Sequence, residues 1–330
     1  MQKNKYQKSI FILFSMMCVC FIGSLLIGKV NIFPSLFDSK SNEMAFIILS
    51  EIRLPRTLLA LLVGASLGLS GAILQGFLRN PLAESGIVGI SSGAALGSVL
   101  CISLGISVHF SFLIPLFGMA GATITAGFLY IILKKYFNVY TVILVGIAIN
   151  SLASSLTSVI LNISKNPYSA LEIIFWLLGS LEGRTMDHVI LCLPFIIVGW
   201  GILWHTRQGL DALSLGEETA QSLGYSVKNT YQKIIVGVAL CIGASVAVSG
   251  IIGFVGLVVP HILRLWVGQK PSNLLVPSML GGGIIVLSSD IITRLPLWDT
   301  ELKLGVVTSL IGAPFFIHLI FKYRKKYAGI

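Results

Sequence analysis

The stretch of sequence that decides the fold is residues 53–93, which read RLPRTLLALLVGASLGLSGAILQGFLRNPLAESGIVGISSG. Within it, residues 57–78 form a run of 22 residues without a charge. A helix of that length is about 33 Å long, which is enough to cross the hydrocarbon core of a bilayer. Arg53 and Arg56 precede the run on one helix face, and the Arg-Asn-Pro of residues 79–81 ends it. The stretch therefore predicts a membrane-spanning helix with charge at both ends.

Small residues recur at every fourth position in three of the predicted helices. Such a ridge lets the backbone of a neighbouring helix approach closely, and it is more typical of helix packing than of a cofactor site. The ridges are Gly64, Gly68, Ala72 and Gly76; Gly89, Gly93 and Gly97; and Gly118, Ala122 and Ala126. We therefore expect a bundle of closely packed helices rather than a single anchor.

The composition of the chain favours one polytopic membrane domain. Hydrophobic residues make up 55% of the 330 residues, charged residues only 11%, and the mean hydropathy is +0.92. A soluble domain usually carries about 25% charge, and no polar stretch is long enough to form a separate domain. We therefore predict an all-α membrane domain over residues 1–330. The net charge of +10 lies mostly between apolar runs, so it indicates topology and lipid contact rather than nucleic-acid binding.

Uncharged runs predict about ten membrane-spanning helices. Both ends of the chain are rich in lysine, so the positive-inside rule places both termini in the cytoplasm and requires an even number of spans. The apolar region 234–267 could form one long helix or two short ones, and the even count favours two. No Ala-x-Ala cleavage site follows the first run, so we expect it to stay as a helix. The predicted spans are about 9–28, 57–78, 86–106, 112–133, 141–162, 189–206, 234–250, 251–267, 273–291 and 304–321.

No sequence pattern predicts catalysis, a bound cofactor or a metal. The chain lacks GxxxxGK[ST] and HExxH patterns, and its five histidines and five cysteines are scattered. Asp290 is the only acid within a predicted span, and it precedes Arg294 by four residues near a helix end, so we expect a local ion pair. The lack of other acids in the spans argues against a proton- or sodium-coupled carrier.

The longest predicted cytoplasmic connection is residues 207–233, RQGLDALSLGEETAQSLGYSVKNTYQK. Glu217 and Glu218 stand in the first turn of a short helical pattern, and Gly224 stands at its end. Acids near a helix N-terminus and glycine after its C-terminus are typical helix boundaries. Because this short helix is apolar on one side, we expect it to pack on the bundle, the lipid interface or a partner.

With these residues in view, the chain resembles the FecCD family of ABC-importer permeases. The resemblance covers essentially the whole chain and rests on several long blocks in the same order. These are the opening stretch, LGEETAQSLGYSV (215–227), SGIIGFVGLVVPHILRLWVG (249–268) and LKLGVVTSLIGAPFFIHLI (302–320). The resemblance implies a type II importer architecture with ten helices, both termini cytoplasmic, and a dimer with the translocation path between its subunits.

The resemblance also implies roles for individual residues. Three arginines match residues that meet acidic groups of an extracytoplasmic binding protein: Arg53, Arg56 and Arg294. The Asn80-Pro81-Leu82 segment matches a cytoplasmic gate of the translocation path, and the 138–141 loop, with Asn138 and Thr141, occupies the place of the second gate. A third segment matches the coupling helix that enters a cleft of the ATPase: Leu215, Gly216, Glu217, Glu218, Ala220 and Gly224.

The function implied by the resemblance is import of a bulky metal chelate across the bacterial cytoplasmic membrane. The implied ligand is a ferric siderophore first, with vitamin B12 and haem as alternatives. The implied partners are two ATP-binding subunits, an extracytoplasmic binding protein and a second permease, identical or related. ATP and magnesium then belong to the ATPase, and this chain is not an enzyme and binds no cofactor. A secondary transporter without an ATPase is the rival from another class.

Overall fold

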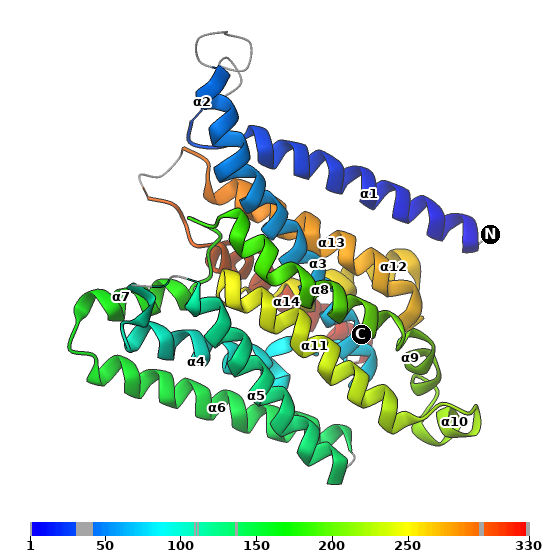
Figure 1. The fold of residues 1–330 in the computed structure, drawn as a ribbon. Helices are drawn as coiled ribbons and strands as arrows, with labels where there is room; N and C mark the ends of the chain where they lie inside the picture. Colours follow the sequence, from blue (N-terminus) through cyan, green and yellow to red (C-terminus); the bar gives the residue numbers. More distant parts are fainter. Residues whose placement is uncertain are drawn as a thin grey trace.

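The computed structural model describes the backbone of residues 2–30, 42–108, 110, 112–135, 138–296 and 300–327. It describes the side chains of residues 6–30, 43–107, 110, 112–135, 138–296 and 300–317. Over these residues the chain is helical and contains no strand. Figure 1 shows the helices gathered into one bundle, with α1 along an outer edge. The short helices α9 and α10 lie at one end, called here the α10 end, and α2 lies at the other, called the α2 end.

The helix boundaries follow the chain in order. They are α1 (Gln2–Leu26), α2 (Asn42–Ile47), a π-helix (Ile48–Arg53), α3 (Leu54–Phe77), α4 (Ile90–Ser103), α5 (Leu113–Lys135), α6 (Val139–Ile163), α7 (Pro167–Leu177), α8 (Met186–Trp204), α9 (Arg207–Leu213), α10 (Glu217–Ser222), α11 (Val227–Ser249), α12 (Val255–Val267), α13 (Pro271–Thr293) and α14 (Leu304–Tyr327). Single 3-10 turns lie at Ser85–Val88 and Ile106–Val108.

The predicted spans correspond to α1, α3, α4, α5, α6, α8, α11, α12, α13 and α14, so the expected all-α polytopic fold is confirmed. Among the described residues, seven helices are long and apolar enough to cross a membrane. Three apolar helices are shorter, namely Ile90–Ser103, Val255–Val267 and the Leu304–Ile317 part of α14. The ambiguous region 234–267 is indeed divided, because α11 ends at Ser249 and α12 begins at Val255.

Three elements were not predicted from the uncharged runs. The helix that contains α3 reaches back through the π-helix and α2, so the apolar span runs from Glu43 to Phe77 and includes charged residues. Helix α7 begins with Pro167, and the side chain of Asn166 caps it by accepting a hydrogen bond from the N–H of Tyr168. Helix α9 fills the start of the long connection. A search for uncharged runs misses such segments because each is short or contains charge.

Glycine contacts set the distance between the central helices. The most extensive helix pairing in the bundle joins α3 and α13. A methyl group at Gly64 would collide with the backbone of Gly282, and one at Gly68 would collide with the carbonyl of Ser278. The second ridge meets α5 in the same way, since Gly97 lies against the carbonyl of Phe117. The predicted small-residue ridges are therefore packing surfaces, as small residues at such contacts allow.

The break between α11 and α12 is irregular backbone inside the bundle. Phe254 has φ of +66° and opens α12, and its N–H donates to the carboxylate of Glu84 at 2.9 Å. Pro260 lies in the first turns of α12 and has no N–H to offer the carbonyl of Gly256. The side chain of Gln75 donates to that carbonyl at 3.2 Å instead. Polar side chains from neighbouring segments thus satisfy the interrupted helix, as a membrane interior requires.

Gly68→Ala is expected to destabilise the protein, because its added methyl group meets the backbone of α13 and neither backbone can move aside cheaply. The matched control is Gly127→Ala in α5, where a methyl group meets nothing within 4 Å. Alanine is also the better helix former there, by about 0.5–1 kcal/mol. Thermal unfolding of the two purified variants checks the prediction. Equal unfolding temperatures for both variants would show that the α3–α13 contact tolerates a wider separation.

Candidate functional site

An ion cluster lies at the α2 end between α3 and α13. Asp290 of α13 is fully buried, and its two carboxylate oxygens meet the Nε of Arg56 at 2.9 Å and the Nη2 of Arg294 at 2.9 Å. Arg56 also pairs with Glu301 at 3.0 Å and donates to the hydroxyl of Thr293 at 3.2 Å. The predicted pair of Asp290 and Arg294 is therefore confirmed, and a second arginine joins it from α3.

Arg294 and Arg53 also bind the C-terminal end of α1. Arg294 donates to the backbone carbonyl of Ser24 at 3.0 Å and to its hydroxyl at 2.6 Å. Arg53 donates to the carbonyls of Leu25 and Leu26 at 3.0 Å and 2.6 Å. The last carbonyls of a helix have no partner within the helix, so guanidinium groups are well suited to satisfy them. The exposed fractions of Arg53, Arg56 and Arg294 are only 4%, 7% and 4%.

These three arginines therefore act, in this conformation, as internal ties between α1, α3 and α13. Only one ion pair of this cluster was predicted from the sequence. The i,i+4 spacing pointed to Arg294, whereas Arg56 and Asp290 are separated by 234 residues. Ser24 and Glu301 carried no signal that sequence reasoning could use.

The segment predicted to couple to an ATPase forms α10 at the opposite end of the bundle. Gly216 precedes the helix with φ of +119°, and Gly224 follows it with φ of +85°, both in a region that favours glycine. Ala220 is fully buried, while Glu218 is exposed. Leu215, just before the helix, is 66% exposed. The predicted short helix is thus present, with one side packed on the bundle and the other open.

A side-chain contact joins α10 to the end of α3. The hydroxyl of Tyr231, on α11, donates to Glu217 at 2.8 Å. The ring of Tyr231 packs edge-on against Phe77 near the C-terminus of α3, with 4.4 Å between ring centroids. Glu217 also pairs with Arg79 at 3.8 Å, a partly exposed contact of little energy. Tyr231 was not predicted, because nothing in its sequence neighbourhood shows that three elements meet there.

The predicted gate residues lie in two separate turns. Asn80 accepts the N–H of Leu82 at 2.9 Å in a turn that also contains Pro81, and it follows Arg79, whose φ is +47°. Leu82 is 37% exposed. The second turn opens α6, where Asn138 accepts the N–H of Tyr140 and Thr141 is half-buried. No hydrogen bond or ion pair joins the two turns among the described residues, whereas the first is tied to α10 through Arg79.

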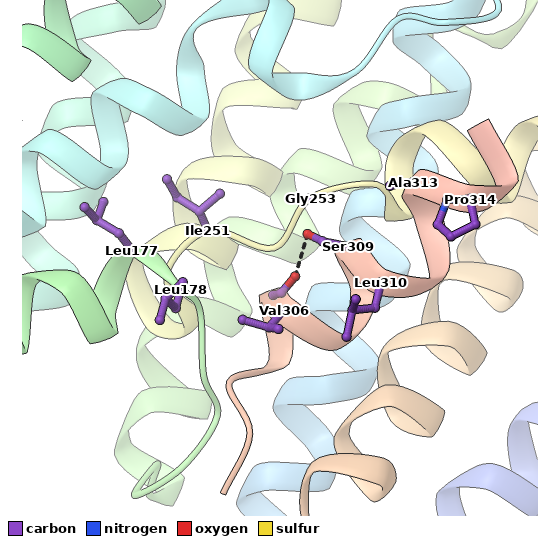
Figure 2. A pocket seen from close by; sticks show the side chains of 10 residues that line it. Leu177, Leu178, Ile251, Gly253, Val306, Ser309, Leu310, Ala313 and Pro314 are labelled. Atoms are coloured by element: carbon purple, nitrogen blue, oxygen red, sulfur yellow. Dashed lines mark hydrogen bonds between the residues drawn. The ribbon is translucent and has the colours of Figure 1, made fainter. Parts of the chain in front are cut away.

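An apolar cavity of about 580 Å³ opens between α7, the 250–253 connection and α14 (Figure 2). Leu177, Leu178 and Ile251 line one side in Figure 2, and Val306 and Leu310 line the other. Ser309 turns its hydroxyl back to the carbonyl of Gly305 at 2.7 Å, so even this polar group offers little to a ligand. The wall is therefore inert toward a polar solute.

One family model and several known proteins match this chain over nearly its whole length. The model of the FecCD transport family matches residues 11–322. The hemin transport system permease HmuU of Yersinia pestis is 38% identical over 93% of each chain. The vitamin B12 import permease BtuC of Vibrio cholerae is 35% identical over 97% of this chain and 95% of that protein. A solved metal-chelate type ABC transporter in an inward-facing conformation superposes with a TM-score of 0.87, at 32% identity over 96% of this chain and 99% of that one.

The bundle of apolar helices and these matches define a multi-pass membrane permease of the ABC importer class. The chain belongs to the FecCD transport family. The resemblance read from its sequence blocks is thereby confirmed.

Asp290→Asn is expected to destabilise the protein by roughly 3–5 kcal/mol, because it leaves Arg294 buried without its charge partner. The matched control is Lys270→Gln, which removes a pair with Asp211 whose lysine is 61% exposed. Such an exposed pair contributes about 0–1 kcal/mol. Chemical or thermal unfolding of both variants in detergent gives the comparison. A loss for Asp290→Asn no larger than the control's would mean that the cluster does not hold α1, α3 and α13 together.

Proposed function

We propose that this chain is the membrane subunit of an ATP-driven importer that moves a bulky metal chelate, a ferric siderophore first, into a bacterial cell. Family membership and the full-length similarity to a metal-chelate type transporter support this class of cargo. Relatives named for hemin and for vitamin B12 keep haem and cobalamin as alternative ligands. The chain itself would bind neither ATP nor magnesium, which belong to the partner ATPase.

The observation that carries the proposal is the exposed side of α10. A helix of six residues needs contacts with its surroundings to keep one orientation. The glycine at each end of α10 and the buried Ala220 provide them. Glu218 and the apolar Leu215 and Leu223 remain exposed beside it. A cavity of about 640 Å³ lies next to these residues, between α9, the turn after α10 and the start of α13. This surface suits a cleft of a cytoplasmic ATPase.

The contacts around Tyr231 suggest how the ATPase would act on the path. Closure of two ATPases on ATP would draw together the α10 helices of two permease copies. Since Glu217 contacts both Tyr231 and Arg79, motion of α10 would be felt at the end of α3 and at the Asn80–Leu82 turn that follows. In this proposal Asn80, Pro81 and Leu82, with Asn138 and Thr141 opposite, form the cytoplasmic gate.

The proposed passage lies between two permease copies. Helix α6 is largely exposed in the single chain and carries small polar residues among its apolar ones. They are Asn150, Ser151, Ser154, Ser155, Ser158 and Asn162. The apolar cavity of Figure 2 offers a second unpartnered wall. Surfaces that offer weak, scattered contacts would let a large chelate pass without being retained.

The binding protein would dock at the α2 end, where Arg53, Arg56 and Arg294 lie. In the present conformation the donors of Arg56 are already directed to Asp290, Glu301 and Thr293. A partner's carboxylate would therefore have to replace Glu301, the half-buried member of the cluster. In this orientation the α10 end and both termini face the cytoplasm, and the membrane is the bacterial cytoplasmic membrane.

The rival proposal is a secondary transporter that works without an ATPase. It would need a titratable or ion-binding group in the membrane interior, and the one buried carboxylate of α13, Asp290, is held between two arginines. Copurification of an ATP-binding subunit with this chain separates the two proposals.

Glu218→Arg is expected to lower ATP-driven uptake at least tenfold while leaving insertion and folding unchanged, because Glu218 is exposed and lacks a side-chain ion pair among the described residues. The matched control is Lys134→Glu, an exposed charge reversal at the end of α5. Uptake into proteoliposomes that contain ATP gives the measurement. Normal uptake by Glu218→Arg would remove α10 from the role of coupling helix.

Replacing Arg53 and Arg56 by glutamate is expected to weaken docking of the binding protein at least tenfold at low salt, and less at high salt. Because Arg56 also holds Asp290, the double variant Arg56→Gln/Glu301→Gln is the gentler comparison, since it removes one charge of each sign. Binding is measured at two ionic strengths on variants whose unfolding temperature has been recorded. Unchanged docking in folded variants would assign these arginines a purely internal role.

A further inference from the structure

A third cavity, with polar walls, lies at the α2 end and is distinct from the cavity of Figure 2. It has a volume of about 240 Å³. The end of α7, the turn before α8 and the residues before α14 enclose it. Its polar walls come from Glu172, Trp176, Ser180, Glu182, Arg184, Ser249 and Lys303.

Two buried donors of this cavity have no acceptor. The Nε of Arg184 and the indole Nε1 of Trp176 are both buried, and neither has a hydrogen-bond partner among the described residues. The guanidinium of Arg184 lies over the Trp176 ring, 4.9 Å from its centroid. Buried N–H groups are nearly always hydrogen-bonded, so two unpaired ones on one cavity need an explanation.

Arg184 also makes no ion pair within 4 Å in the part of the chain that the structure describes. Lys303 and Glu182 already form a pair at 2.8 Å, and the hydrogen bond from Lys303 lowers the pKa of Glu182. Burial lowers the pKa of Arg184 to about 10, so its guanidinium is still protonated at neutral pH. Glu172 is the remaining acid on the wall, and it makes no ion pair within 4 Å among the described residues.

The cavity is held open by rigid backbone. Ser180 donates its N–H to the carbonyl of Ser249 at 2.7 Å, which ties the turn after α7 to the end of α11. Gly250 has φ of +69° and packs so closely on the carbonyl of Trp176 that a methyl group would collide with it. The backbone of Trp176 is therefore held against the end of α11.

We propose that this cavity binds a single carboxylate group, held by Arg184 and Trp176. A carboxylate accepts several hydrogen bonds and pairs strongly with a guanidinium, so it would satisfy both donors and the unpaired charge. Arg184 supplies one unpaired positive charge and Glu172 is an unpaired acid on the same wall, so a singly charged carboxylate fits better than doubly charged sulfate or phosphate. A small organic acid and an acidic side chain of a docked protein offer the same group.

The first experiment uses propionate, which has the carboxylate and chain of a glutamate side chain. It is titrated into the full-length chain in lipid nanodiscs, with sulfate at equal ionic strength as the comparison. Arg184→Gln is expected to weaken propionate binding about tenfold or more, and Trp176→Phe, which keeps the ring and removes the N–H, about three- to tenfold. Lys165→Gln, an exposed cation after α6, is the matched control and should bind propionate as the unmodified chain does.

The second experiment tests the other source of the carboxylate and rests on the proposed function. Docking of the purified binding protein is measured with the same three variants. Weaker docking for Arg184→Gln and Trp176→Phe, without propionate binding by any protein, supports the site and assigns its carboxylate to the partner.

The proposal is overturned if propionate binds equally to Arg184→Gln and the unmodified chain. It is also overturned if propionate does not bind and docking is absent or insensitive to both substitutions. Water would then fill the cavity. The propionate titration needs no partner, so its failure is distinct from a failure of the proposed importer function, which shows as a missing ATPase or binding protein.

Discussion

The close approach of α3 and α13 is the constraint on which the rest of the bundle depends. Helices in lipid gain little from burying apolar surface against one another, so tight van der Waals contact between glycine-rich faces has to hold them. At Gly64, Gly68 and Gly282 the two backbones touch directly. This contact sets the distance at which Arg56 of α3 reaches Asp290 of α13. The ion cluster thus lies at the end of the same closely packed helix pair.

The same logic explains where irregular backbone is tolerated. The 250–254 connection interrupts a long apolar segment, and the missing donor of Pro260 would leave a carbonyl unsatisfied inside the bundle. Gln75 and Glu84 come from the end of α3 and the turn after it, and they satisfy this region at Gly256 and Phe254. Burial raises the pKa of Glu84, and the hydrogen bond from Phe254 opposes that rise. Side-chain hydrogen bonds thus join the helix break to the end of α3 and to the residue that follows the 80–83 turn.

The sequence predicted features with a local period and missed those that depend on distant partners. The four-residue spacing of glycines, the i,i+4 pair of Asp290 and Arg294, and the short helix between its two glycines were all correctly inferred, because each is encoded within a few residues. Arg56 with Asp290, and Tyr231 with Glu217 and Phe77, required the packed structure. Helix α7 was missed because it is too short to span a bilayer and contains Glu172. The roles of docking, gating and coupling came from family resemblance, and no local pattern alone specifies them.

The way α1 is attached has a consequence for assembly in the membrane. Most of its surface is exposed, and its strongest polar contacts are at one end, where Arg53 and Arg294 bind the carbonyls of Ser24, Leu25 and Leu26. Arg294 is made 270 residues after Ser24. During synthesis the first helix therefore enters the bilayer long before its last partner exists. Its final attachment can form only after nearly the whole permease has been inserted. The earliest helix is therefore among the last to be fixed.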